Sequence, residues 1–115
     1  MHEFSLASEV MSIALNEAEK HNAIWVSEIT IEVGSLSGVE ADAFESALSL
    51  LAEGSIVEKS GIKILRINGM GFCDGCNAEF EMTQRMEFCP ECNSFPSVIK
   101  GGNEFRLTSL VIEEQ

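Results

Sequence analysis

Four cysteines in the second half of the chain have the residue type and the spacing of a metal site. Cys73 and Cys76 form one Cys-x2-Cys pair, Cys89 and Cys92 form another, and twelve residues separate the two pairs. Each pair supplies two thiolates from one tight turn, and four thiolates satisfy the tetrahedral preference of Zn(II). Four such ligands leave no open coordination position, so the spacing predicts a structural zinc rather than a catalytic one.

A redox role for these cysteines fits the pattern less well. A redox Cys-x-x-Cys motif usually occurs once, beside a βαβ pattern, whereas here two pairs occur at ribbon spacing. The start of the chain lacks the basic stretch and long apolar run of a signal peptide, so we expect a cytoplasmic protein whose thiols stay reduced. No apolar run approaches the roughly 20 residues that span a bilayer, so no membrane association is expected.

The first three residues form a second candidate metal site with different chemistry. Histidine at position 2 is expected to be too large for Met1 to be removed. The amine of Met1, the amide nitrogen and imidazole of His2, and the amide or carboxylate of Glu3 can then surround one ion. Planar nitrogen ligation favours Cu(II) and Ni(II) over zinc. Taken alone the motif is weak, and an accidental histidine at a frayed terminus is the simpler interpretation.

Composition narrows the class of protein. A chain of 115 residues with 45% hydrophobic residues is about one domain, with room for a small insertion. Acidic residues outnumber basic ones 19 to 7, which gives a formal charge of −12. Such a surface repels nucleic acid and anionic membranes, because binding to phosphates relies on Lys and Arg. Cations and basic partner surfaces fit it better.

We expect one helix and then one strand in the first third of the chain. Residues 4–21 show an apolar stripe with helical spacing, and His21 is interpreted as a helix terminus rather than a ligand. Residues 25–34 alternate as a strand does, with positions 25, 27, 29, 31 and 33 expected to face inward. Trp25 could belong to the core or to an exposed partner surface, and the alternation leaves both open.

A second helix and two further strands complete the expected elements. Ser37 followed by Glu40 is the capping-box pattern, so a helix is expected to begin at Ser37 and to end before Gly54. Residues 61–68 should form a strand with Leu65 or Ile67 inward. Residues 104–112 should form another, with positions 105, 107, 109 and 111 on one face.

The order of elements predicts a small α+β fold. We expect a three-stranded sheet with two helices, plus an inserted four-cysteine module that resembles a zinc ribbon. Residues 1–69 and 102–115 would form the α/β domain, and residues 70–101 the zinc-binding module. Within the module a short two-stranded ribbon is expected over the metal, with apolar side chains at Phe80, Met82, Met86 and Phe88.

Four motifs in the same order resemble the HypA/HybF family of hydrogenase maturation nickel chaperones. They are Met1-His2-Glu3, the segment VGSLSGVE at 33–40, the cysteine quartet with CPECNS at 89–94, and GNEFRL at 102–107. Together they extend over the whole chain. The resemblance implies a protein that is not an enzyme, that binds Ni(II) as transient cargo and that contains structural Zn(II).

The resemblance also assigns residues and partners. His2 would be the principal nickel ligand, Met1 would supply its amine and Glu3 its backbone amide, and Glu40 would lie near the nickel. The implied partners are the nickel-handling GTPase HypB, the large subunit of NiFe hydrogenase and, in some organisms, urease maturation proteins. The chain itself would be a monomer or a weak homodimer.

One departure and one alternative accompany this interpretation. Some relatives have histidines beside the second cysteine of a pair, whereas here Asn77 and Asn93 stand there, so no exchange of thiolate for imidazole is expected. The alternative function is a zinc-ribbon adaptor that binds protein and no second metal. Nickel calorimetry on the untagged protein would distinguish the two.

Overall fold

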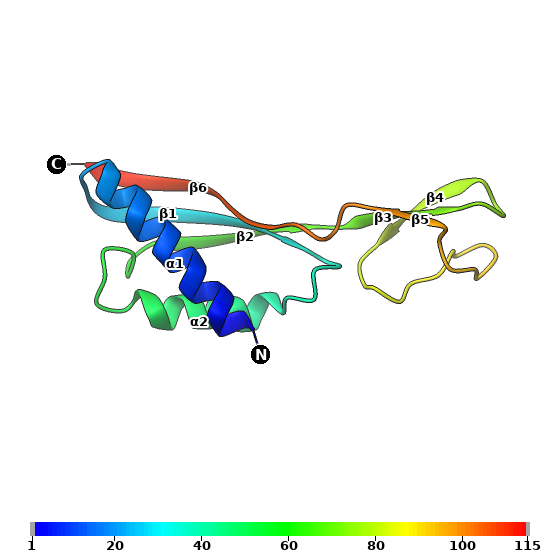
Figure 1. Ribbon diagram of the computed structural model, residues 1–115, viewed down its shortest axis with the longest axis horizontal. Coiled ribbons are helices and arrows are strands. Elements are labelled where there is room, and N and C mark those ends of the chain that lie inside the picture. Colours follow the sequence, from blue (N-terminus) through cyan, green and yellow to red (C-terminus); the bar gives the residue numbers. More distant parts are fainter. Residues whose placement is uncertain (1, 115) are drawn as a thin grey trace. The chain divides into compact units, whose positions relative to one another are not determined.

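The computed structural model describes residues 2–114 and contains two helices and two small sheets (Figure 1). The α+β class expected from the sequence is confirmed. One sheet has the strand order β2-β1-β6 and the other β4-β3-β5. The elements are α1 (Glu3–Lys20), β1 (Ala23–Gly34), α2 (Ala41–Ala52), β2 (Gly61–Ile67), β3 (Gly69–Cys73), β4 (Ala78–Met82), β5 (Val98–Lys100) and β6 (Phe105–Glu114).

Backbone contacts divide the chain into two compact units. The helical unit comprises the residues up to Ile31, Glu40–Leu65 and those from Arg106 onward. The cysteine unit comprises Glu32–Val39 and Arg66–Phe105. The predicted division into an α/β domain of residues 1–69 and 102–115 and a zinc-binding module of residues 70–101 stays a prediction.

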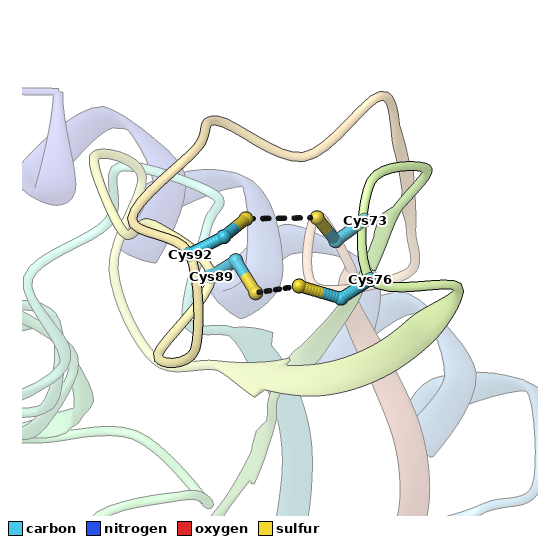
Figure 2. Close-up of side chains that lie close together, drawn as sticks. All are labelled: Cys73, Cys76, Cys89 and Cys92. Carbon is cyan, nitrogen blue, oxygen red and sulfur yellow. Dashed lines mark hydrogen bonds between the residues drawn. The ribbon is translucent and has the colours of Figure 1, made fainter.

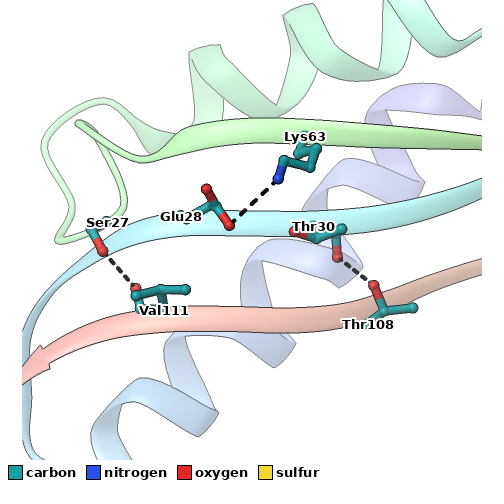
Figure 3. Close-up of polar contacts among 6 residues, drawn as sticks. All are labelled: Ser27, Glu28, Thr30, Lys63, Thr108 and Val111. Carbon is teal, nitrogen blue, oxygen red and sulfur yellow. Dashed lines mark hydrogen bonds and ion pairs between the residues drawn. The ribbon is translucent and has the colours of Figure 1, made fainter.

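The helical unit has its core between two packed helices and one sheet. Figures 1 and 3 show both helices on the same side of the sheet. Phe44 and Leu48 of α2 and Ile29 of β1 are fully buried. The apolar stripe expected in the first helix is the side that α1 buries from its second turn onward, at Ala7, Val10, Met11, Ala14 and Ala18, whereas Phe4, the first residue of the expected stripe, is 52% exposed.

The start of α2 differs from the expected capping box. Glu40, not Ser37, is the N-cap, and its carboxylate accepts a hydrogen bond of 2.7 Å from the amide of Ala43. The hydroxyl of Ser37 instead donates to the carbonyl of Gly34 at 2.7 Å. Gly38 has a φ of 82°, which no α-helix contains. The N-cap of the helix therefore lies three residues later than predicted, because the serine stabilises the preceding turn.

In the first strand the inward face is partly as expected. Ile29, Ile31 and Val33 are buried, whereas Trp25 is 52% exposed and therefore a surface residue. Ser27, also expected inward, is exposed. Its hydroxyl donates to the carbonyl of Val111 at 3.2 Å on the neighbouring strand (Figure 3).

The inward face of β6 changes along the strand. Leu107 is half-buried as expected, but Ser109 and Val111 are exposed, and Leu110 and Ile112 are half-buried in their place. Two successive exposed residues, Thr108 and Ser109, reset the alternation, which a strict period of two does not anticipate.

In β2 the half-buried residue is Ile67, and Leu65 is exposed. This settles which of the two residues faces inward.

The cysteine unit contains a three-stranded sheet, so the expected two-stranded ribbon is wrong. β3 lies in the centre and pairs antiparallel with β4 and with β5. Met86 and Phe88 lie outside the strands, in the loop between β4 and β5, and both are exposed. The third strand comes from residues far along the chain, so local spacing could not indicate it.

Leu36, in the segment before α2, is held in the cysteine unit by hydrogen bonds and by side-chain packing. Leu36 is 4% exposed, and its amide donates to the carbonyl of Gly102 at 2.7 Å. Its side chain fills the space that a Cβ on Gly69 or Gly102 would need. The guanidinium of Arg85 donates to the Leu36 carbonyl at 3.0 Å. This contact spans 49 positions of sequence, and no local signal points to it.

Candidate metal centres

The four cysteines come together in the cysteine unit (Figure 2). Their Sγ atoms all lie within 4.8 Å of one another. The sulfurs of Cys73 and Cys92 are 3.4 Å apart, and those of Cys89 and Cys76 are 3.8 Å apart. A tetrahedral zinc with bonds of about 2.3 Å would separate its sulfurs by about 3.8 Å. The donor set and its spacing therefore fit a tetrahedral thiolate-bound metal.

Two tight turns bring these side chains to one point. Cys73 ends β3, and Cys76 lies in the turn that leads to β4. In the second pair the amide of Cys89 donates to the carbonyl of Ser94, and the amide of Asn93 donates to the carbonyl of Cys89, both at 2.8 Å.

Asparagine follows the second cysteine of each pair. Asn77 has a φ of 53° and Asn93 a φ of 65°. This left-handed conformation is one that asparagine tolerates better than most residues, as the sequence pattern suggested.

The pKa values of the clustered cysteines favour the binding of a cation. The neighbouring sulfurs of Cys92 and Cys89 raise the pKa of Cys76 to about 12. The side chain and then the backbone amide of Ser94 lower the pKa of Cys92 to about 6. One thiolate is therefore stable at neutral pH, but further negative charge beside it is unfavourable. A divalent metal would remove this repulsion and allow all four thiolates to form.

The predicted nickel residues lie in the helical unit, except that Met1 is outside the described residues. His2 is exposed and occupies the N-cap position of α1 without a hydrogen bond from its side chain to the helix. Its carbonyl accepts the hydrogen bond of the Leu6 amide at 2.9 Å. The imidazole is therefore not used in capping the helix.

Glu3 and Glu40 lie side by side although 37 positions separate them. A carboxylate oxygen of Glu3 accepts a hydrogen bond of 3.1 Å from the amide of Glu40. The amino-terminal ammonium group, followed by this amide, lowers the pKa of the Glu3 carboxyl to about 2. The carboxylate of Glu40 itself is engaged in capping α2. The structure thus brings Glu40 to Glu3 through its backbone.

The remaining histidine lies at the other end of the same helix. His21 is the C-cap residue of α1, and its amide donates to the carbonyl of Ala18 at 3.2 Å, while the amide of Asn22 donates to the carbonyl of Glu19 at 3.1 Å. It is a helix terminus, as the sequence indicated. Among residues 2–114 neither helix has the length and apolar character needed to cross a membrane.

Comparison with known sequences identifies one family over nearly the entire chain. The sequence profile described as "Hydrogenase/urease nickel incorporation, metallochaperone, hypA" matches residues 1–112. A protein of Francisella philomiragia named hydrogenase maturation factor HypA is 38% identical, over 96% of this chain and 98% of its own length. A protein of Parabacteroides distasonis with the same name is 36% identical over the full length of both chains.

Solved structures give the same result. The solution structure of the nickel metallochaperone HypA from Helicobacter pylori superimposes with a TM-score of 0.66. That chain is 26% identical, and the match covers all of both chains.

Proposed function

This chain belongs to the HypA family of hydrogenase and urease nickel-incorporation metallochaperones, and on that premise we propose that it binds one Ni(II) at its first three residues and delivers it for hydrogenase maturation. The ligands are the amine of Met1, the amide and imidazole of His2, and the backbone amide of Glu3. The chain acts as a carrier and not as an enzyme. Nickel is its cargo, so the ion must leave by exchange of ligands with a partner.

The observation that carries this proposal is the pattern of hydrogen bonds made by the groups around His2. The first amides of an α-helix have no acceptor among the helix carbonyls, so the amides of His2 and Glu3 take no part in the backbone hydrogen bonds of α1. The imidazole is exposed and makes no capping bond. The Glu3 carboxylate, in contrast, is held by the Glu40 amide. We therefore propose that the nickel ligands are nitrogen atoms of the backbone and of His2. The hydrogen bond between Glu3 and Glu40 would hold the start of α1 against the start of α2.

The four cysteines serve a separate, structural purpose in this proposal. Cys73, Cys76, Cys89 and Cys92 hold one Zn(II), which when bound supplies free energy of folding. The sulfur spacing supports this assignment, because it matches a tetrahedral zinc site. With four thiolates the metal has no open position. Residues 70–101 form the zinc-binding module, and residues 1–69 with 102–115 carry the nickel site.

The partners follow from the family. The proposed partners are the GTPase HypB and the large subunit of NiFe hydrogenase, with urease maturation proteins as further clients where the organism has them. All of these steps are proposed to occur in the cytoplasm. A formal charge of −12 favours partners that present basic surfaces.

Nickel titration of the zinc-loaded, untagged protein tests the proposal. We expect one high-affinity nickel site by calorimetry. His2→Ala should abolish this nickel binding because it removes the imidazole ligand. Two residues added before Met1 should also abolish it, because Met1 then no longer has a free amine. His21→Ala is the matched control, since His21 caps the far end of α1. It should bind nickel as the unchanged protein does.

Two results would reject the nickel site at the first three residues. One is high-affinity binding that persists in His2→Ala. The other is an untagged protein that binds no nickel while its zinc content is intact, which would favour the adaptor function. Zinc content, measured by mass spectrometry of the native protein, should equal one ion in every variant.

A further inference from the structure

A hollow in the helical unit lies beside the single tryptophan of the chain, and we call it the Trp25 hollow. It has a volume of about 730 Å³. Its walls come from the end of α1, the start of β1 and the loop after α2, and they include Leu15, Glu19, Ile24, Trp25, Glu58 and Lys59. Trp25 is 52% exposed and Ile24 is 48% exposed, so the start of β1 presents two adjacent apolar side chains to solvent.

The walls of the Trp25 hollow are held in place by hydrogen bonds between β1 and the loop after α2. The amide of Val26 donates to the carbonyl of Ile56 at 2.9 Å, and the hydroxyl of Ser60 donates to the carbonyl of Val26 at 2.7 Å. Val57, which lies in the loop between these two contacts, is buried. A ligand would therefore find the hollow already formed, and the entropy cost of binding is lower for a formed site.

The charges around the Trp25 hollow are mainly negative. Both helices end on the same side of the helical unit, on the left in Figure 1. The carboxyl end of a helix carries roughly half a negative charge, and α2 has no basic residue in its last turn to offset it. The side chains that line the hollow add two carboxylates, Glu19 and Glu58, against one ammonium group, Lys59. Among residues 2–114 these three side chains form no ion pair.

An arginine side chain matches an exposed indole that is surrounded by negative charge. Tryptophan is the aromatic side chain that attracts a cation above its ring most strongly. The guanidinium group is planar, so it can stack on the indole and still donate hydrogen bonds to a carboxylate. An anionic ligand would instead meet two carboxylates and two helix carboxyl ends. The hollow also falls in the range of roughly 300–1,000 Å³ that holds more than a single guanidinium group.

We propose that the Trp25 hollow binds an arginine-bearing apolar segment of a protein partner. The guanidinium group lies over the indole of Trp25, toward the carboxylates of Glu19 and Glu58, and a neighbouring aliphatic side chain covers Ile24. Tryptophan and arginine are among the residues that dominate the energy of protein interfaces. The segment is basic, which suits a chain with a formal charge of −12.

The Trp25 hollow is separate from the residues proposed to bind nickel. α1 has 18 residues and is therefore about 27 Å long, with His2 at its first end and the hollow beside its last turns. The inference goes beyond the proposed function and does not rest on it, because no nickel ligand takes part in the contact.

Titration of the full-length, zinc-loaded protein with the peptide acetyl-Leu-Arg-Leu-Arg-Leu-amide tests the proposal. The chain has one tryptophan and no tyrosine, so tryptophan emission reports on the Trp25 hollow alone. We expect a saturable change of emission with a Kd below about 1 mM. The same peptide with citrulline, the neutral analogue of arginine, should bind about tenfold more weakly because it has no cation for the indole.

Variants measured by calorimetry locate the contact. Trp25→Ala should weaken peptide binding by about tenfold or more, and Trp25→Phe, which keeps a ring, should weaken it less. Glu58→Gln should weaken it by about threefold, as expected for an exposed charge pair. Glu45→Gln is the matched control for charge, because Glu45 is exposed on α2 and does not line the hollow. It should bind the peptide as the unchanged protein does, and all four variants should bind nickel equally.

The proposal is overturned if the unchanged protein does not bind the peptide at roughly millimolar concentration. It is also overturned if the citrulline peptide binds equally well, or if Trp25→Ala or Glu58→Gln binds the peptide as Glu45→Gln does. Arginine amide is the probe for a small cation, and it should bind about tenfold more weakly than the peptide because it lacks the leucine side chains. Equal affinity would assign the hollow to a small cationic ligand and reject the protein partner.

Discussion

Removal of the metal from the four cysteines should unfold the cysteine unit and leave the helical unit folded. The perturbation is Cys76→Ser, or a strong chelator under reducing conditions. The matched control is Asp74→Ser, an exposed change in the same turn that removes no sulfur. The expectation follows from how little apolar burial this unit has of its own.

The buried side chains give the free energy by which apolar burial stabilises the cysteine unit. Apart from cysteines, the buried hydrophobic side chains of the cysteine unit, all of whose residues the structure describes, are Val33, Leu36 and Met82. At about 1.5–3 kcal/mol for each, they stabilise the unit by roughly 5–9 kcal/mol. A structural zinc contributes about 10–16 kcal/mol. If the four cysteines hold zinc as proposed, the metal would therefore be the larger of the two contributions.

The helical unit does not share this dependence. Its core includes Ala7, Val10, Ile29, Phe44 and Leu48, all of which are buried. None of these residues belongs to the cysteine unit. We therefore expect α1 and α2 to persist when the metal is removed.

Amide NMR spectra with and without metal provide the assay. In Cys76→Ser, the signals of residues 70–100 should collapse to the narrow range of unfolded chains, while those of α1 and α2 stay dispersed. Asp74→Ser should retain both sets. A cysteine unit that stays folded without metal would refute the reasoning, and so would loss of both units together.

Three further predictions concern stability and nickel. Glu40→Ala removes the cap on Ala43 and should lower the free energy of unfolding by about 1 kcal/mol in urea titrations; Glu40→Ser, which can still cap, should recover most of it, and an unchanged midpoint would contradict the capping role. Gly102→Ala should cost about 2–5 kcal/mol, because φ is 87° and the new Cβ would lie 2.8 Å from Leu36. Gly54→Ala, with φ of 80° and no atom within 4 Å, should cost only about 1–2 kcal/mol, and equal losses by thermal melting would be evidence against crowding. Nickel affinity should fall as pH falls, by up to about tenfold per pH unit for each proton displaced, and a pH-independent calorimetric affinity would exclude amine and imidazole ligands.

The sequence alone determined the features that depend on neighbours in the chain. Cysteine spacing predicts a thiolate metal site, and the structure brings all four sulfurs together. The apolar stripe of the first helix and the inward face from Ile29 to Val33 follow from the 3.6 and 2.0 periodicities, which local geometry sets. Four ordered motifs were enough to indicate the family.

Tertiary structure decided the features that join distant residues. Whether Ser37 or Glu40 caps α2 depends on the turn that Gly34 and Gly38 form, not on spacing. The third strand of the cysteine sheet exists because residues 98–100 return to β3. The contact of Glu3 with the Glu40 amide likewise needs α1 and α2 packed together. Each of these contacts closes a long loop, and only burial and hydrogen bonding across the fold offset the entropy of closing it.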